Sequence, residues 1–379
     1  NVVPGTEVFE LYDTFGFPVD LTNLIAEGYK MTIDEVSFNE ELEKQKSRSR
    51  KDAETETGDW ILLKEDDKEE FVGYDYTESE VYITRYRKVI VKEKDVYQLV
   101  FNFTPFYAEG GGQVGDRGYI EANGAKTSIF DTKKENNLII HFTNELPADT
   151  SSNFKAVVDT NKRTLTANNH TATHLMHEAL REVLGTHVEQ KGSLVNEKYL
   201  RFDFSHFSKV TDEELAKVEA IVNQRIRQNI NLEEQRMVPV NKAKEMGAMM
   251  LFGEKYGDVV RVIKFGTSIE LCGGIHVENT SQIGSFKITT ESSIASGIRR
   301  IEAITSIAAD KHLQSQLDLI DEVRNLLKGP KDIKKAISDL LGQNSKLNKE
   351  IELLKKDKAG DVKKELLDAI EPINGVNFL

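Results

Sequence analysis

Two imidazoles stand four residues apart in the stretch Asn169-His170-Thr171-Ala172-Thr173-His174-Leu175-Met176-His177. Apolar residues recur at helical spacing within and beyond this stretch and predict a helix over residues 164–184. On that helix His170 and His174 project from one face one turn apart, so both rings can meet a single ion. His177 shares the face, and spacing alone leaves it as an alternative ligand.

A second stretch reads Glu270-Leu271-Cys272-Gly273-Gly274-Ile275-His276. Its two glycines end an apolar strand and let the backbone fold back around a small ion. Cys272, the only cysteine of the chain, and His276 then supply a thiolate and a third imidazole. Three imidazoles and one thiolate suit tetrahedral zinc, at roughly 2.0 to 2.3 Å from nitrogen and sulfur.

These histidines have two other interpretations. A histidine pair at helical spacing is more often a surface or core pair than a metal site, but the cysteine motif favours metal. A thermolysin-type protease is disfavoured, because no glutamate follows His170 to act as the base of a His-Glu-x-x-His motif.

Three further motifs lie between the two stretches. They are Gln190-Lys-Gly-Ser-Leu-Val195, Arg201-Phe-Asp-Phe-Ser-His206 and Leu251-Phe-Gly-Glu-Lys-Tyr-Gly-Asp258. Together the five motifs resemble the editing domain of alanyl-tRNA synthetases, and the resemblance covers nearly the whole chain. It implies hydrolysis of the ester that joins serine or glycine to the alanine tRNA. It also implies zinc held by His170, His174, Cys272 and His276, with Gln190 positioning the substrate or a water.

A glycine-rich loop occurs earlier, in Phe106-Tyr-Ala-Glu-Gly-Gly-Gly-Gln-Val-Gly-Asp116. Bare backbone at the glycines lets a ligand approach, although a plain loop between strands is the alternative. The resemblance implies an editing loop in which Gly111, Gly112 and Gln113 bind substrate. Two positions depart from the family: Gly110 stands where serine is usual, and Ile275 where threonine is usual.

The pattern of the chain changes three times and predicts an α+β protein of four regions. Residues 1–60 have helical spacing and resemble the end of the tRNA-recognition region of the family. Residues 61–159 alternate with period two and predict a small β-barrel that carries the glycine-rich loop. Residues 160–305 predict the zinc-containing unit, with helices on an antiparallel sheet and a capping box at Thr211 and Glu214.

Residues 306–379 predict a helical hairpin or coiled coil leading toward a further C-terminal module. Apolar residues alternate by four and three at Ile333, Ile337, Leu340, Leu347, Ile351 and Leu354, with Asn344 as one polar position. Such a seam fits either an antiparallel hairpin broken at Gly329-Pro330 or a homodimerisation arm.

Composition limits the partners and the compartment. The formal charge of −13 argues against an extended nucleic-acid footprint, so an RNA partner requires local basic stretches such as residues 44–51 or Arg299-Arg300. No run approaches the roughly 18 apolar residues of a membrane helix, and Asn1-Val2-Val3-Pro4 lacks a signal-peptide pattern. With a single cysteine, these features predict a cytoplasmic protein.

The main expectation is therefore the zinc-dependent editing part of an alanyl-tRNA synthetase, acting on the alanine tRNA mischarged with serine or glycine. No ATP-binding core is expected in this chain, since no Gly-x-x-x-x-Gly-Lys loop occurs. Two alternatives stay open: a zinc-stapled tRNA-binding module without hydrolytic activity, and a free-standing trans-editing protein.

Overall fold

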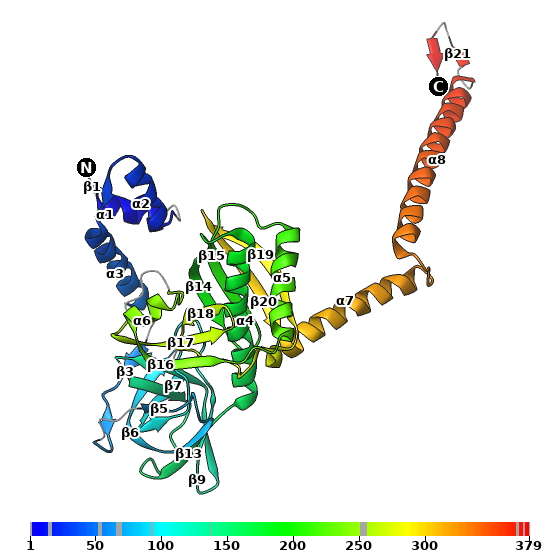
Figure 1. The fold of residues 1–379 in the computed structure, drawn as a ribbon. Coiled ribbons are helices and arrows are strands. Elements are labelled where there is room, and N and C mark those ends of the chain that lie inside the picture. The colour runs from blue at the N-terminus through cyan, green and yellow to red at the C-terminus, as the bar shows by residue number, and fades with distance from the viewer. Residues whose placement is uncertain are drawn as a thin grey trace. The chain divides into compact units, whose positions relative to one another are not determined.

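The computed structural model describes residues 2–13, 17–51, 55–65, 70–91, 94–136, 138–250, 256–368, 371–373 and 376–378. The chain forms two compact units, Asn1–Asp310 and Lys311–Leu379 (Figure 1). Helices and antiparallel sheets are both present, which confirms the mixed α and β class. The finer division into four regions stays a prediction.

The first unit begins with the expected helices, α1 (Gly5–Asp13), α2 (Val19–Gly28) and α3 (Glu35–Lys51). A short parallel pair, β1 (Val2–Val3) and β2 (Thr32–Ile33), joins them. Val8 and Phe38 are buried where α1 packs on α3, and the ring of Tyr12 meets that of Phe38 edge-on. Of the basic stretch 44–51, the side chains of residues 45–51 lie outside the described residues.

The β-rich part contains many short strands. They are β3 (Thr55–Thr57), β4 (Ile61–Leu62), β5 (Glu70–Phe71), β6 (Glu78–Val91), β7 (Lys94–Phe101), β8 (Phe103–Thr104), β9 (Gly118–Ala122), β10 (Ala125–Ile129), β11 (Asp131–Glu135), β12 (Leu138–Thr143) and β13 (Asn153–Val158). The main sheet has the order β10-β9-β13-β6-β7-β12-β11, with β3 and β4 also on β6. The long strand β6 forms a corner: its first part pairs with β13, its second with β7, and a bulge separates Ile83 from Arg85.

The closed barrel expected from the sequence is not confirmed. Among the described strands, the pairing path is open, and β10 and β11 are its two ends. These end strands are consecutive in the chain, and only Phe130 lies between them. The chain therefore passes from one end strand to the other, but no backbone hydrogen-bond ladder between them closes the sheet into a barrel. Alternation of apolar residues could not predict this, because it shows which face of a strand is buried and not which strands pair. A core that includes Ile83, Leu99 and Phe154 fills the space between the layers.

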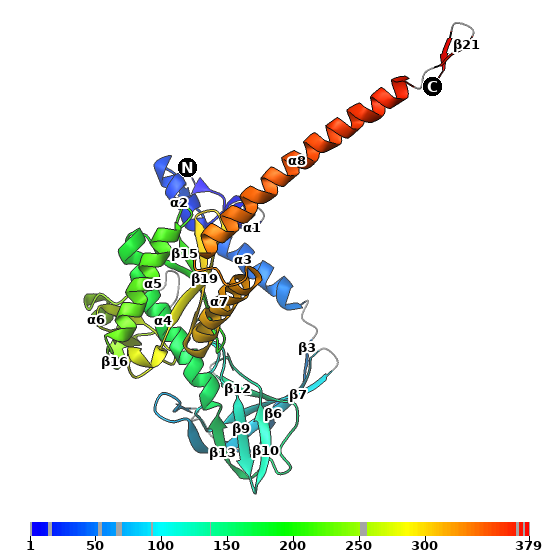
Figure 2. The same ribbon diagram turned by 90° about the vertical axis from the view of Figure 1, so that its right-hand side faces the viewer.

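The rest of the first unit contains two sheets and the helices around them, among them α4, which carries His170 and His174. The elements are α4 (Thr160–Leu184), β14 (Gln190–Val195), β15 (Leu200–Ser205), α5 (Asp212–Arg227), β16 (Glu233–Pro239), α6 (Val240–Glu245), β17 (Val259–Phe265), β18 (Ser268–Leu271), η1 (Thr280–Ile283), β19 (Phe286–Ala295) and β20 (Ile298–Thr305). Helices α4 and α5 pack on the antiparallel sheet β14-β15-β20-β19, as expected (Figure 2). Strand β17 belongs to a separate three-stranded sheet, β16-β17-β18.

Capping side chains set the first residues of the two long helices in this part, α4 and α5. Asp159 caps α4 by accepting from the backbone N–H of Lys162, so the helix starts slightly before the predicted residue 164. The capping box of α5 is confirmed, because Thr211 and Glu214 each bind the other's backbone N–H. Of the motif at residues 251–258, residues 251–255 lie outside the described residues.

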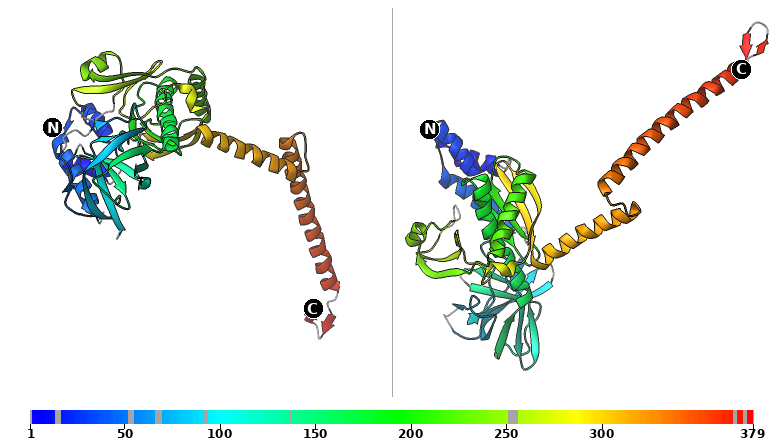
Figure 3. Two further views of the ribbon diagram at one scale, coloured as in Figure 1. Left: turned by 90° about the horizontal axis from the view of Figure 1, so that it is seen from below. Right: turned by 45° about the vertical axis from the view of Figure 1, so that its right-hand side comes forward.

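The second unit contains most of α7 (Ser306–Leu326), all of α8 (Ile333–Asp368) and the antiparallel pair β21 (Glu371–Ile373) and β22 (Val376–Phe378) (Figure 3). Lys328 and Gly329 adopt positive φ between the helices, which confirms the predicted break. No residue of α8 is buried. The intramolecular hairpin is therefore not confirmed, because a hairpin would bury the seam; the dimerisation arm stays a prediction.

Candidate metal centre

Helix α4 presents His170 and His174 from one face, as its spacing predicts. Its first turn is fixed by Arg163, whose buried guanidinium pairs with Asp116 and donates to the carbonyl oxygens of Gly73 (3.0 Å) and Pro105 (2.5 Å). Asp116 also accepts from the backbone N–H of Tyr107 at 2.7 Å. The start of the metal helix is thereby tied to the base of the glycine-rich loop.

The second pair of donors comes from the loop that follows β18. The Sγ of Cys272 lies 3.4 Å from His170 Nε2 and 3.3 Å from His276 Nε2. The donor atoms of His170, His174, Cys272 and His276 all lie within 4.8 Å of one another. A tetrahedral zinc ion separates its nitrogen and sulfur ligands by roughly 3.3 to 3.6 Å, as its bond lengths require. The four donors can therefore hold one metal ion, and the geometry favours His174 over His177 as the fourth.

Hydrogen bonds set the orientation of two rings. Gln113 Oε1 is 2.7 Å from His170 Nδ1, which must donate, so Nε2 keeps a lone pair toward the thiol. Thr171 Oγ1 lies 3.1 Å from His276 Nδ1 and also accepts from the backbone N–H of Val277. Outer partners of this kind fix ring orientation in metal sites.

Burial keeps these rings neutral, which metal binding requires. Loss of solvent lowers the pKa of His170 and His276 well below the usual value, and nearby histidines and Arg261 act in the same direction. Burial also lowers the pKa of His174, although the carboxylate of Glu270 opposes the shift. All three can act as ligands at neutral pH without first losing a proton.

Glu270 is a buried carboxylate between two histidines. One of its oxygens lies 3.6 Å from His174 Nε2 and the other lies 3.2 Å from His177 Nδ1. Burial acts to raise the pKa of Glu270, but the two histidines outweigh it and lower the pKa overall. Its negative charge would offset the positive charge that a divalent ion keeps after binding one thiolate and three neutral imidazoles.

Small residues let the segments approach. A Cβ on Gly274 would lie 2.0 Å from His170 Cε1 and 2.8 Å from Gln113 Oε1. Gly112 has a φ of +82°, and a Cβ there would lie 2.8 Å from the backbone oxygen of Ser193. The glycine-rich loop docks on β14 through this contact, where Val195 donates to Gly112 O at 2.7 Å.

Three of the four donor residues, His170, His174 and Cys272, line a pocket of about 830 Å³. Gln190 and Ser193 on β14 line it, together with Gly110 and Gly111. Gly112 and Gln113 are not among the lining residues; Gln113 is buried and its amide oxygen is used by His170 and by the backbone N–H of Ile275 (2.8 Å). The structure thus places Gln190 in the pocket lining, whereas Gln113 contacts His170 of the donor cluster.

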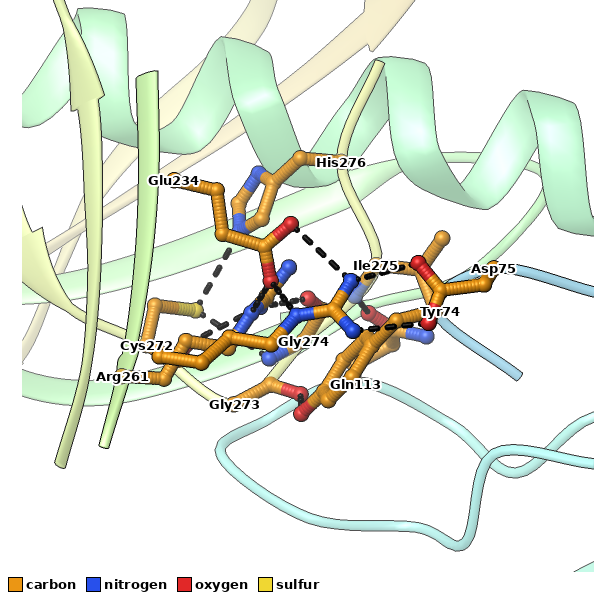
Figure 4. A network of polar contacts seen from close by, with 11 residues as sticks. Tyr74, Asp75, Gln113, Glu234, Arg261, Cys272, Gly273, Gly274, Ile275 and His276 are labelled. Carbon is orange, nitrogen blue, oxygen red and sulfur yellow. Dashed lines mark hydrogen bonds and ion pairs between the residues drawn. The ribbon is translucent and has the colours of Figure 1, made fainter. Parts of the chain in front are cut away.

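A polar network that no sequence pattern predicts surrounds the cysteine loop (Figure 4). Arg261 on β17 donates to the carbonyl oxygens of Cys272 (3.0 Å) and Gly274 (2.6 Å), and Tyr74 donates to that of Gly273 (2.6 Å). Burial raises the pKa of Tyr74, so its phenol keeps this proton at neutral pH. Neither Glu270, within the cysteine stretch, nor Arg261, between valines of the stretch 259–263, is singled out by a sequence pattern.

The basic candidates Arg299 and Arg300 are engaged within the sheet. Arg299 Nε lies 2.5 Å from Glu291, and Arg300 binds both oxygens of Asp203 at 2.6 and 2.7 Å. These pairs support a structural role for both arginines.

Comparisons with known proteins place the chain first in a class and then in a family. The family described as tRNA synthetases class II (A) matches residues 1–163, and the threonyl and alanyl tRNA synthetase second additional domain matches residues 260–302. The second match contains the cysteine loop of the metal cluster.

Curated relatives narrow the class to one family. The alanine–tRNA ligase of Christiangramia forsetii is 56% identical over 100% of this chain and 44% of its own length. Those of Cytophaga hutchinsonii and Flavobacterium psychrophilum are 52% and 53% identical over 100% of the chain and 43% and 44% of their own lengths. The chain belongs to the alanyl-tRNA synthetase family and spans less than half the length of these relatives. Among the described helices, none has the length and apolar character needed to cross a membrane.

Proposed function

We propose that this chain is the proofreading part of an alanine–tRNA ligase and hydrolyses the ester of serine or glycine mischarged onto the alanine tRNA. The observation that carries the proposal is the convergence of His170, His174, Cys272 and His276, of which the first three line a pocket of about 830 Å³. The donor set suits zinc. Because relatives match the chain over its full length, a segment of a synthetase is favoured over a free-standing editing protein.

A site that selects alanine needs a second, proofreading site beside it, because glycine and serine are close to alanine in size. A pocket built for alanine rejects glycine and serine only weakly, since one methyl or hydroxyl group contributes on the order of 1–3 kcal/mol. A site that hydrogen-bonds the serine hydroxyl leaves polar groups unpaired when alanine enters, and can discriminate by roughly 10⁴. The pocket contains such groups in Thr173, Gln190 and Ser193.

The roles of individual residues follow from their positions. Four protein donors fill a tetrahedral ion, so bound zinc would supply a positive charge that orients the ester. Gln190, at the first position of β14, faces the same pocket and positions the substrate or the attacking water. Gly110 and Gly111 present bare backbone to the substrate, while Gln113 holds the ring of His170.

The test is hydrolysis of seryl-tRNA for alanine by the zinc-loaded chain, with correctly charged alanyl-tRNA as the control substrate. Cys272→Ala should lose hydrolysis, and Gln190→Ala should lose at least tenfold in rate while retaining zinc and fold. Well-folded, zinc-loaded wild-type chain that leaves seryl-tRNA intact would contradict the proposal.

That same outcome would support the second candidate, a tRNA-binding module in which zinc only stabilises the fold. The buried cluster is compatible with such a role, because structural zinc sites also use four protein ligands. Retained tRNA binding without hydrolysis distinguishes this module from the editing site.

A homodimer through α8 is the further partner that the structure supports. The seam residues Leu340, Leu347 and Leu354 are each more than half exposed, at 56%, 57% and 62%. A second copy of the helix could cover such a seam, with Asn344 setting its register.

A further inference from the structure

Side chains bind the backbone of the loop that carries Cys272. Three consecutive carbonyl oxygens, those of Cys272, Gly273 and Gly274, each accept a hydrogen bond from a side chain. Only two side chains supply all three bonds. Arg261 binds the first and third carbonyls, and Tyr74 binds the second (Figure 4).

The two side chains also hold each other. The guanidinium of Arg261 lies 4.0 Å from the centre of the Tyr74 ring, a cation–π distance. Arg261 Nε donates to Glu234 Oε1 at 2.6 Å, and the Arg261 side chain is only 10% exposed. Its charge is thus paired through Nε, and the planar guanidinium then directs a single nitrogen, Nη1, to both carbonyls.

Opposite faces of the loop have opposite partners. The carbonyls face Arg261 and Tyr74, whereas the N–H groups of Gly274 and Ile275 face Cys272 Sγ (3.3 Å) and Gln113 Oε1 (2.8 Å). A peptide turned over would lose a carbonyl bond on one side and aim an oxygen at the sulfur on the other. The carbonyl bonds therefore select the loop conformation that points Sγ at His170.

We propose that Arg261 and Tyr74 are positioning residues of the metal site: they clamp the Cys272–Gly274 backbone so that thiol and imidazoles are organised before an ion binds. The inference rests on the proposed zinc site. Tyr74 lies between β5 and β6, 199 residues from the loop, so the β-rich part is a structural component of the site. The clamp acts through the backbone of the loop, although Arg261 also lines the proposed substrate pocket.

Arg236 provides a matched control. It belongs to the same network, binding Asp75 at 2.7 Å and Glu234 at 2.6 Å, and its guanidinium lies 5.0 Å from the Tyr74 ring. None of its hydrogen bonds reaches the loop. Substituting Arg236 changes the charge of the network by the same amount as substituting Arg261, but leaves the three carbonyl bonds in place.

The experiment measures zinc affinity of the whole chain by competition with a chromophoric chelator, and urea unfolding of the zinc-free chain. Arg261→Gln should weaken zinc binding about 10- to 100-fold, the range for outer-shell partners of metal ligands. Tyr74→Phe keeps the ring and removes one bond, and should weaken binding about threefold to tenfold. Arg236→Gln should stay within about twofold of wild type. Arg261→Lys, which keeps the charge without the planar fork, should fall between Arg261→Gln and wild type.

A purely structural role makes a different prediction. Arg261→Gln would then lower the urea midpoint of the zinc-free chain and leave the affinity of the folded fraction at the wild-type value. That result would overturn the proposal, as would equal affinities for Arg261→Gln and Arg236→Gln. If Arg261→Gln does not fold, Tyr74→Phe decides by the same criteria. Wild-type chain that binds no zinc overturns this inference and the metal site together, whereas zinc-loaded, hydrolytically active Arg261→Gln of normal affinity overturns the inference alone.

Discussion

At the scale of single residues, Gly274 has space for a hydrogen atom and nothing larger. Replacing it with alanine places a methyl group 2.0 Å from His170 Cε1, so the ring or the loop must shift. We expect Gly274→Ala to weaken zinc binding at least about tenfold, as displaced ligand supports do. Chelator competition measures the loss.

The neighbouring glycine is the control for this prediction. A Cβ on Gly273 meets only Tyr74 Oη, at 3.8 Å, an ordinary contact. Gly273→Ala should keep wild-type affinity. If both alanine variants bind zinc equally well, the close approach of loop and helix is not what sets the affinity.

His141 predicts a dependence of stability on pH. Its Nδ1 donates to the carbonyl of Leu99 and its Nε2 lies 2.7 Å from Thr104 Oγ1, while its ring stacks on Phe101. Burial lowers the pKa of His141 to about 3. In the unfolded chain the pKa is about 6.5, so between these values only the unfolded state binds the proton.

The stability contributed by neutral His141 is therefore present above pH 6.5 and is lost as the pH falls toward 3. From pH 7 to pH 5 the free energy of unfolding should fall by about 2 kcal/mol on account of this group. His141→Gln removes the titration, so urea unfolding at the two pH values should show a smaller loss than in wild type. If His141→Gln and wild type lose the same unfolding free energy between the two pH values, His141 is not the source of the loss.

At the scale of elements, the ion pair between Arg163 and Asp116 joins α4 to the glycine-rich loop. Both side chains are nearly buried, at 6% and 7% exposure. Asp116→Asn leaves the guanidinium buried without its counter-charge, which costs about 3–5 kcal/mol of unfolding free energy. Urea unfolding measures it.

A surface pair serves as comparison for the buried one. Lys155 and Glu78 lie 2.9 Å apart on adjacent strands but are 47% and 57% exposed. Glu78→Gln should leave the unfolding midpoint unchanged, because exposed pairs are screened by water. Similar midpoints for Asp116→Asn and Glu78→Gln would mean that the junction of helix and loop does not limit stability.

Elements also show how far the sequence predicts this molecule. Periodicity located α4 and the shared face of His170 and His174, and the capping box at Thr211 located the start of α5, because both signals are local. The cysteine motif named the other two donors. The clamp by Tyr74 and Arg261 was missed, since it joins the segment between β5 and β6 and strand β17 to the cysteine loop through backbone carbonyls that no side-chain pattern reports. Barrel closure failed for a similar reason: alternation assigns faces to strands, not partners.

At the scale of the whole molecule, the two compact units differ in how their apolar residues are used. Among the described residues, the first unit buries three apolar clusters, whereas α8 buries no residue and leaves leucines along its length exposed. Heptad spacing with an exposed seam is typical of a helix completed by association. The second unit therefore has the features of a helix that associates with another copy, and the first unit contains all four donor residues of the candidate metal site.

This difference predicts separable behaviour. A chain ending at Asp310 should keep the zinc affinity and urea midpoint of the full chain, because all four donors and the clamp lie before that residue.

Sedimentation equilibrium should give a dimer mass for the full chain and a monomer mass for the chain that ends at Asp310. Leu340→Glu with Leu347→Glu should give monomer at full length, since charge in the seam opposes pairing, whereas Leu353→Glu is a control of similar exposure, 61%, off that seam. If the shortened chain loses zinc, the units are coupled; if the full chain already has monomer mass, the seam does not pair two copies.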